Sequence, residues 1–273
     1  MGVSDRKISA CLVVFNEEAI IRRCLESIAG LVDEIIVVHD GPCKDGTLDI
    51  AREFTDRVFV KDHIGIAEPH RSFTYAEARH EWIFQIDADE YLDAADHEKI
   101  RALVSGGKAD AWIFAWELRE GDRTVRFPGL QKLCLFRKDA ASYQGIPQTI
   151  VVIRGITEKA DIVLHHRPGY DCVSWETANR KRDYWLRSHL DYFFPELVKY
   201  ECFNTAPDSW IAYTKRIRKH PFFYLAWYPL KNFLGQMKNG LWKTPLGRKI
   251  ALQQYVYYFE MHRRIWLKNR QLG

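Results

Sequence analysis

The sequence predicts an α/β fold with a parallel sheet at its centre and a helical extension at its C-terminal end. Over the first 93 residues, short apolar runs of strand length alternate with stretches whose apolar residues recur at the helical period. The loops between them are short, and this alternation implies parallel strands joined by right-handed crossovers. Acidic residues follow directly after two of the strands, at the sheet edge where open α/β sheets bind their ligands.

The elements of this first half follow one another in a regular order. A buried strand at Ile8–Phe15 leads into a helix that opens at Asn16 and closes at Gly30. The remaining elements are strands at 34–38, 58–60 and from Trp82, and helices at 48–54 and 69–80.

The strand that begins at Trp82 ends in three carboxylates, Asp87, Asp89 and Glu90. In an extended backbone Asp87 and Asp89 point the same way and Ala88 points the other way. Two hard oxygen ligands at a strand end suit Mg²⁺ or Mn²⁺, which completes its shell with water and substrate phosphates. An isolated Asp-x-Asp is more often a solvated turn or a helix start, so the interpretation depends on the motifs upstream.

The second half predicts a mixed sheet followed by helices. Further strands are expected at 109–118, 125–127, 132–137, 149–153 and 161–165, and residues 172–200 are expected to be helical. The predicted domains are therefore an α/β domain at 1–170, with halves at 1–93 and 94–170, and a helical, basic and aromatic extension at 171–273.

Two classes of nucleotide-binding protein, Rossmann dehydrogenases and P-loop proteins, lose support because their sequence motifs are missing. No Gly-x-Gly-x-x-Gly follows an early strand, and the chain has no Gly-x-x-x-x-Gly-Lys-Ser/Thr loop.

The six cysteines are scattered without a Cys-x-x-Cys pair, which favours a reducing cytosol. With no leader and no apolar run long enough to span a bilayer, the expected location is cytoplasmic.

The overall net charge of +4 hides a basic C-terminal segment. Residues 211–273 hold 13 lysines and arginines against a single acid, Glu260, and the basic clusters alternate with Trp, Tyr and Phe. This pattern predicts peripheral contact with anionic lipid at the inner face of the membrane. The alternative is that these helices pack on the α/β domain or on a second subunit, with a solvated charged face. Nucleic acid, a rival partner for basic and aromatic surfaces, has no other support.

The order of motifs in residues 7–93 resembles the inverting glycosyltransferases of family 2, which have the GT-A fold. The resemblance rests on Phe15-Asn16-Glu17, on Asp40 to Thr47, on Arg71 and Arg79, and on Asp87 to Glu90. It is strongest to the subgroup that adds sugars to lipopolysaccharide core or related surface glycans.

The resemblance implies a nucleotide-sugar donor, with UDP favoured over GDP or dTDP, and a glycan or lipid-linked acceptor. It places Phe15, Asn16, Glu17, Asp40, Arg71, Asp87 and Ala88 at the donor. It makes Asp87 and Asp89 ligands of Mg²⁺ or Mn²⁺, with Asp89 the more direct ligand, and brings His165 near the metal or the diphosphate. Taken singly, Asp40 fits a turn, Glu17 a helix start, Arg71 an exposed helix position and His165 a polar loop.

The catalytic base is where the sequence departs from the family pattern. Relatives carry a His-Glu pair at a segment where this chain has Pro147 and Gln148, and a Gln amide cannot accept a proton at neutral pH. Glu90 and Glu117 are the substitute candidates. The alternative is a degenerate transferase that acts as a nucleotide-sugar-binding or scaffold subunit. A sugar nucleotidyltransferase is disfavoured because its Gly-rich N-terminal loop is missing. The sugar, the acceptor and the oligomeric state have no signature in the sequence.

Overall fold

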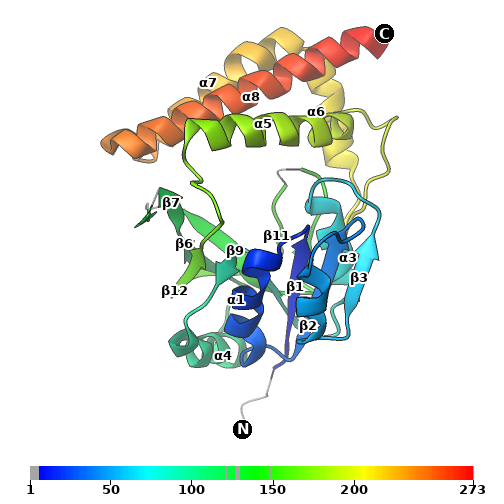
Figure 1. Cartoon of the computed structure of the whole chain (residues 1–273). Coiled ribbons are helices and arrows are strands. Elements are labelled where there is room, and N and C mark those ends of the chain that lie inside the picture. Colours follow the sequence, from blue (N-terminus) through cyan, green and yellow to red (C-terminus); the bar gives the residue numbers. More distant parts are fainter. Residues whose placement is uncertain (1–5, 121, 127–129, 148, 273) are drawn as a thin grey trace. The chain divides into compact units, whose positions relative to one another are not determined.

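The computed structural model describes residues 6–120, 122–126, 130–147 and 149–272 of the chain. The chain forms two compact units, which are described separately below (Figure 1). The first unit contains the residues up to Gly169 together with Tyr200–Ala206, and the second contains Tyr170–Lys199 and the residues from Pro207 onward.

The first unit is built on an eight-stranded mixed sheet with the strand order β3-β2-β1-β4-β9-β6-β12-β5. The strands from β3 to β4 are all parallel, as predicted, and β9 then runs antiparallel to both of its neighbours, β4 and β6. The bounds are β1 (Ile8–Val14), β2 (Glu34–Asp40), β3 (Val58–Lys61), β4 (Trp82–Gln85), β5 (Glu90–Tyr91), β6 (Ala111–Trp116), β9 (Gln131–Arg137) and β12 (Thr157–His166).

Helices and two small sheets complete this unit. The helices are α1 (Glu18–Ala29), α2 (Thr47–Arg52), α3 (Glu68–Glu77), the 3-10 turn η1 (Ala94–Asp96) and α4 (His97–Gly106). The small sheets pair β7 (Leu118–Glu120) with β8 (Arg123–Val125), and β10 (Ala141–Ser142) with β11 (Val152–Ile153).

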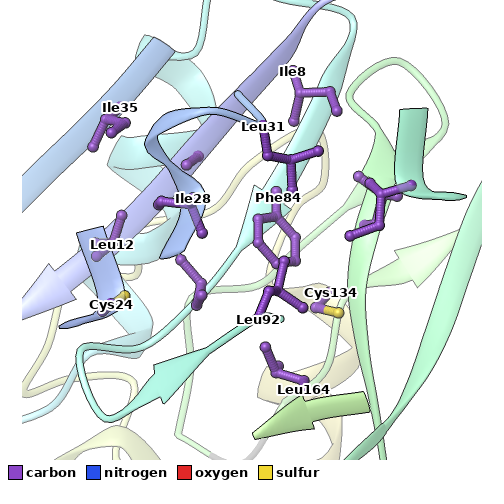
Figure 2. Packing of buried hydrophobic residues seen from close by; sticks show 14 of the residues in the cluster. Ile8, Leu12, Cys24, Ile28, Leu31, Ile35, Phe84, Leu92, Cys134 and Leu164 are labelled. Carbon is purple, nitrogen blue, oxygen red and sulfur yellow. The ribbon is translucent and has the colours of Figure 1, made fainter. Parts of the chain in front are cut away.

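The sheet is buried on both faces, as its continuous apolar strands predict. On one face Leu12 of β1 and Phe84 of β4 pack with Ile28 of α1 (Figure 2). On the other face Cys11 of β1 and Tyr75 of α3 belong to a second buried cluster. Because adjacent residues of a strand point to opposite faces, each central strand serves both clusters and is fixed in register.

The second unit is helical. It consists of α5 (Trp175–His189), the 3-10 turn η2 (Leu190–Phe193), α6 (Asp208–Lys219), α7 (Pro221–Lys238), the 3-10 turn η3 (Leu241–Lys243) and α8 (Pro245–Leu272). Helices α7 and α8 lie side by side, shown in orange and red in Figure 1. Among the described residues, no helix has both the length and the apolar character needed to cross a bilayer.

The predicted α/β class with a C-terminal helical region is therefore confirmed, and the differences lie at the ends of elements. The strand predicted at 109–118 is divided into β6 and the first strand of the β7–β8 hairpin. The strand predicted at 149–153 is reduced to β11, two residues long. Both differences fall in the region where the chain leaves the central sheet, and the described residues include no neighbouring strand that extends the pairing.

Candidate functional site

The candidate site lies where three neighbouring parallel strands end. Strand β1 is hydrogen-bonded to β2 on one side and to β4 on the other. The chain continues from β1 into Phe15-Asn16-Glu17, β2 ends at Asp40, and β4 is followed by Asp87-Ala88-Asp89. The predicted donor-site residues therefore collect at one edge of the sheet, which is where α/β folds bind ligands.

Asn16 forms the sharp turn between β1 and α1. Its φ of 52° lies in the left-handed region, which Asn tolerates better than most residues. Its backbone N–H donates to Nε2 of the buried His39 at 3.2 Å, so the His39 proton is on Nδ1, which donates to the carbonyl of Gly41 at 2.6 Å. The Asn16 side-chain oxygen accepts from the N–H of Lys44 at 2.9 Å, which ties the β1 and β2 loops together.

Glu17 and Phe15 flank this turn. The Glu17 carbonyl accepts from Ile20 and Ile21 at the start of α1, and its N–H donates to Thr47 at 2.6 Å. The Phe15 ring is partly exposed and stacks on His63, with ring centroids 4.8 Å apart. Phe15 and His63 thus provide an aromatic surface at the strand edge.

Asp40 holds the loop that carries His63. Its carboxylate accepts from the backbone N–H groups of Ile64 at 2.6 Å and Gly65 at 2.8 Å, and from Nε2 of His70 at 2.9 Å. Burial by itself would raise the pKa of Asp40, but the hydrogen bonds from His70 and the two amides outweigh it and lower the pKa. The ionised carboxylate is therefore committed to positioning this loop.

Asp87 lies between two cations. Arg71 of α3 donates to Oδ1 at 2.8 Å, and Lys132 of β9 donates to Oδ2 at 2.8 Å. Burial would raise the pKa of Asp87, but the two cations reverse the direction and hold it well below its usual range. The small side chain of Ala88 is buried on the opposite side of the turn, in the cluster that contains Phe84.

Glu90 is enclosed by the same group of residues and is only 1% exposed. Its Oε2 accepts from Lys132 at 2.6 Å and from the N–H of Asp87 at 2.8 Å, and its Oε1 accepts from the indole of Trp116 at 2.7 Å. Burial raises the pKa of Glu90, opposed by Lys132. Both oxygens of Glu90 accept hydrogen bonds. Glu90 therefore supports, from its buried side, the turn at residues 87–90, which we call the acidic turn.

Asp89 contacts His166. Its Oδ2 accepts from Nε2 of His166 at 3.0 Å, and its carbonyl accepts from the N–H of Arg167 at 2.7 Å. The His166 ring packs against Trp116 with centroids 4.5 Å apart. This carboxylate–imidazole pair brings one oxygen and one nitrogen ligand together.

His165 is held by a different group of residues. Its Nδ1 lies 2.9 Å from Glu117 and its Nε2 lies 3.0 Å from Asp93, and the ring stacks on Tyr91. Glu117 is buried and also accepts from Arg126 at 2.6 Å. The structure thus places His166, and not the predicted His165, beside Asp89, because successive residues of β12 point to opposite faces.

Two of the site residues that were missed from the sequence had a usable signal. Ile162 and Leu164 are buried on β12, so the two-residue period assigns His166 to their face and His165 to the other. Lys132 immediately precedes the apolar Leu133–Phe136 run of β9, where an unpaired charge would be costly. His70 had no comparable signal, since its contact with Asp40 joins elements 30 residues apart.

No three His, Cys, Asp or Glu side chains within the described residues form a group that could by itself hold a metal ion. In particular, Asp87, Asp89 and His165, the predicted metal set, do not come together as one group. Pro147 is buried, and Gln148, the residue expected in place of the catalytic Glu, lies outside the described residues.

Comparison with known protein families shows which family the chain belongs to. The model of glycosyl transferase family 2 matches residues 9–162, from β1 into β12. The chain belongs to this family. Together with the mixed sheet, family 2 membership agrees with the expected GT-A fold.

The family 2 relatives match over part of their length. An uncharacterised glycosyltransferase of Rickettsia typhi is 32% identical over 145 residues, which are 50% of this chain and 49% of that protein. The lipopolysaccharide core biosynthesis glycosyltransferase LpsC of Rhizobium meliloti is 31% identical over 116 residues, 41% of each chain. The chain thus spans about half the length, or less, of these curated relatives. The crystal structure of S. aureus TarS 1–349 in complex with UDP-GlcNAc aligns with 98% of this chain and 92% of its own, at 13% identity and a TM-score of 0.46.

Proposed function

We propose that this protein transfers a sugar from a nucleoside-diphosphate donor, in the first instance a UDP-sugar, to a hydroxyl group with inversion at the anomeric carbon. The observation that carries the proposal is the convergence of Asn16, Asp40, Asp87 and Asp89 at three adjacent strand ends within the segment that matches family 2. The proposed acceptor is a glycan or lipid-linked sugar of the cell envelope, in keeping with the name of the relative LpsC.

The donor nucleoside is assigned to the β1–β2 side of the site. The exposed face of the Phe15–His63 stack suits a nucleobase, because aromatic rings bind base faces by stacking. We propose that Asp40 acts by positioning this loop, since its carboxylate contacts the Ile64-Gly65 backbone, His63 of the loop and His70 of α3. Asp87 lies at the end of β4, the strand on the other side of β1, and is proposed to face the ribose.

Asp89 and His166 are the residues proposed to hold a divalent Mg²⁺ or Mn²⁺ ion. A carboxylate oxygen and an imidazole nitrogen 3.0 Å apart fit a partial ligand set, and water and diphosphate oxygens complete such a shell. When bound, the ion would neutralise the charge that develops on the departing nucleoside diphosphate. Arg71 and Lys132 place two positive charges beside the turn that contains Asp87, and they keep Asp87 ionised.

The burial and the contacts of both predicted bases support structural roles for them. A general base must come within hydrogen-bond reach of the proton that it accepts. Glu90 and Glu117 are both buried, and each is bound to a cation and to a ring N–H. We therefore place Glu90 as the support of Asp87, and Glu117 as the support of His165.

The test is thermal stabilisation by UDP, GDP and dTDP with and without Mn²⁺, for the wild type and for Asp89→Ala. A ligand that binds only the native state raises its melting temperature by mass action. We expect Mn²⁺-dependent stabilisation by UDP that Asp89→Ala removes and that the control Asp49→Ala, on the exposed face of α2, retains. An absence of stabilisation by every nucleotide would contradict the donor site. Release of UDP from UDP-sugars in the presence of acceptor then separates an active transferase from a nucleotide-binding scaffold.

A further inference from the structure

Helix α7 has two faces of different character. Its inner face packs on α8, where Tyr224 lies 5.6 Å from His262 and Tyr228 lies 5.6 Å from Tyr258, between ring centroids. Tyr224 and Pro229 are buried by this packing. These contacts, with those of α6, form the apolar core of the helical unit, so α7 needs no further cover to be stable there.

The outer face of α7 is apolar and exposed. Phe223, Trp227, Leu230 and Leu234 follow the spacing i, i+4, i+7, i+11, which places them on one side of a helix. Their exposed fractions range from 40% to 56%. We call these four residues the α7 stripe. Phe222, at the start of α7, and Trp242, in η3, are also exposed large hydrophobic residues. Single exposed apolar residues are ordinary, but a row of four along one helix marks an interaction surface.

The charges on α7 itself are all positive. Helix α7 contains no acidic residue, and its two charged residues, Lys231 and Lys238, are exposed. The preceding helix α6 ends in the exposed Lys215, Arg216 and Lys219. The single acid of residues 211–273, Glu260, lies on α8 and is paired with Arg263 at 2.9 Å.

We propose that the α7 stripe docks on an anionic lipid bilayer, with α7 lying in the interface and its lysines reaching the headgroups. Large aromatic and Leu side chains on one face with lysine beside them are the pattern of interfacial helices. Anionic lipid complements the excess of positive charge, whereas a second copy of this chain would bring two basic surfaces together. In one respect the proposal deepens the proposed function and rests on it: the protein would encounter a lipid-linked acceptor at the membrane surface to which the α7 stripe binds.

The test is flotation of the purified protein, residues 1–273, with vesicles of phosphatidylcholine or of an equimolar mixture of phosphatidylcholine and phosphatidylglycerol. We expect the protein to float with the mixed vesicles and to be released as salt is raised, since surface charge attraction is screened. The double variant Trp227→Ser/Leu230→Ser removes two apolar side chains and should bind at least about tenfold more weakly. A matched control is Ile150→Ser/Ile156→Ser, which makes the same kind of change at two exposed residues of the first unit, 78% and 52% exposed, and should bind like the wild type.

Three outcomes would overturn the proposal. One is failure of the wild type to float with the mixed vesicles, and another is equal flotation of wild type and the α7 double variant. The third is a wild-type dimer in solution, measured by light scattering, that the double variant converts to a monomer. Flotation needs neither donor nor metal, so its failure leaves the transferase proposal intact. Conversely, flotation without nucleotide stabilisation would contradict the donor site alone.

Discussion

The ammonium of Lys132 lies 2.6 Å from Oε2 of Glu90 and 2.8 Å from Oδ2 of Asp87, so one cation joins two carboxylates beneath the acidic turn. Burial alone would lower the pKa of Lys132, but the two carboxylates raise it, and the lysine stays charged. Without this cation, Asp87 and the buried Glu90 would repel each other, and one of them would take up a proton. Lys132 therefore sets the charge state of the turn that presents Asp89.

Replacing Lys132 by Met should destabilise the first unit by about 3–5 kcal/mol, because a buried ion pair that loses one partner leaves an uncompensated charge. Urea unfolding at neutral pH measures the loss. The control is Lys99→Met, since Lys99 pairs with Asp96 at 2.6 Å but its side chain is 60% exposed, and its removal should change the unfolding free energy little. Equal effects of the two substitutions would show that Lys132 is not specially required.

His166 and His165 should differ in their effect on metal-dependent nucleotide binding. His166→Ala removes the imidazole that contacts Asp89 and should weaken the Mn²⁺-dependent binding of UDP at least about tenfold. His165→Ala disturbs the contacts with Glu117, Asp93 and Tyr91 but not the one with Asp89, so UDP affinity should be retained. Calorimetric titration of UDP in the presence of Mn²⁺ measures both affinities. Loss of affinity in His165→Ala with retention in His166→Ala would restore the assignment made from the sequence.

Gly145 should be intolerant of any side chain. Its φ is +61°, and a Cβ atom there would lie 1.9 Å from the carbonyl oxygen of Glu201 and 2.5 Å from Oγ of Ser72. The clash falls where Tyr143 and Phe203 exchange backbone hydrogen bonds and hold residues 200–206 against the rest of the first unit. Gly145→Ala should therefore cost about 2–4 kcal/mol of unfolding free energy.

The matched control for this glycine is Gly106→Ala. Gly106 ends α4, has no atoms within 4 Å of its added Cβ, and has no positive φ. Alanine there should leave stability unchanged or raise it by up to about 1 kcal/mol. Denaturant unfolding compares the two variants, and a Gly145→Ala protein as stable as Gly106→Ala would contradict the close approach of Glu201.

His262 should make the helical unit sensitive to acid. The ring is buried against Tyr224 and Tyr228, and neither ring nitrogen has a hydrogen-bond partner among the described residues. Burial lowers the pKa of His262 from 6.5 to about 4. Between pH 6.5 and about pH 4, the unfolded chain therefore binds a proton at His262 and the folded unit does not. Stability is fully present above pH 6.5 and falls by about 3 kcal/mol as the pH drops toward 4.

The His262 prediction is checked by the slope of unfolding free energy against pH. His262→Leu should flatten the slope between pH 6.5 and pH 4, while His220→Leu, at an exposed histidine of the same unit, should keep the wild-type slope. An unchanged slope in His262→Leu would mean that the acid sensitivity comes from other groups.

Much of the first unit could be predicted because its signals are local. The apolar runs at Ile8 and Trp82 indicated the central strands, and the alternation with helices through short loops indicated that these strands are parallel. Because parallel strands end at one edge of a sheet, the sequence places Asp40 and Asp87 at that edge, whereas the neighbour order β2-β1-β4 comes from the structure. The alternation of side chains along β12 could also be read from the sequence. It would have favoured His166 over His165 as the residue on the buried face.

The sequence by itself determined the α/β class, the parallel strands of the first 93 residues, the acidic turn after β4 and the basic, aromatic character of residues 211–273. Only the tertiary structure decided that Lys132 joins Asp87 to Glu90, that His70 and His63 engage Asp40, and that one face of α7 stays uncovered. Periodicity and turn chemistry act between residues close in sequence. The pairing of a buried charge depends instead on which distant segment the folded sheet brings within about 3 Å, a distance set by hydrogen-bond geometry rather than by sequence.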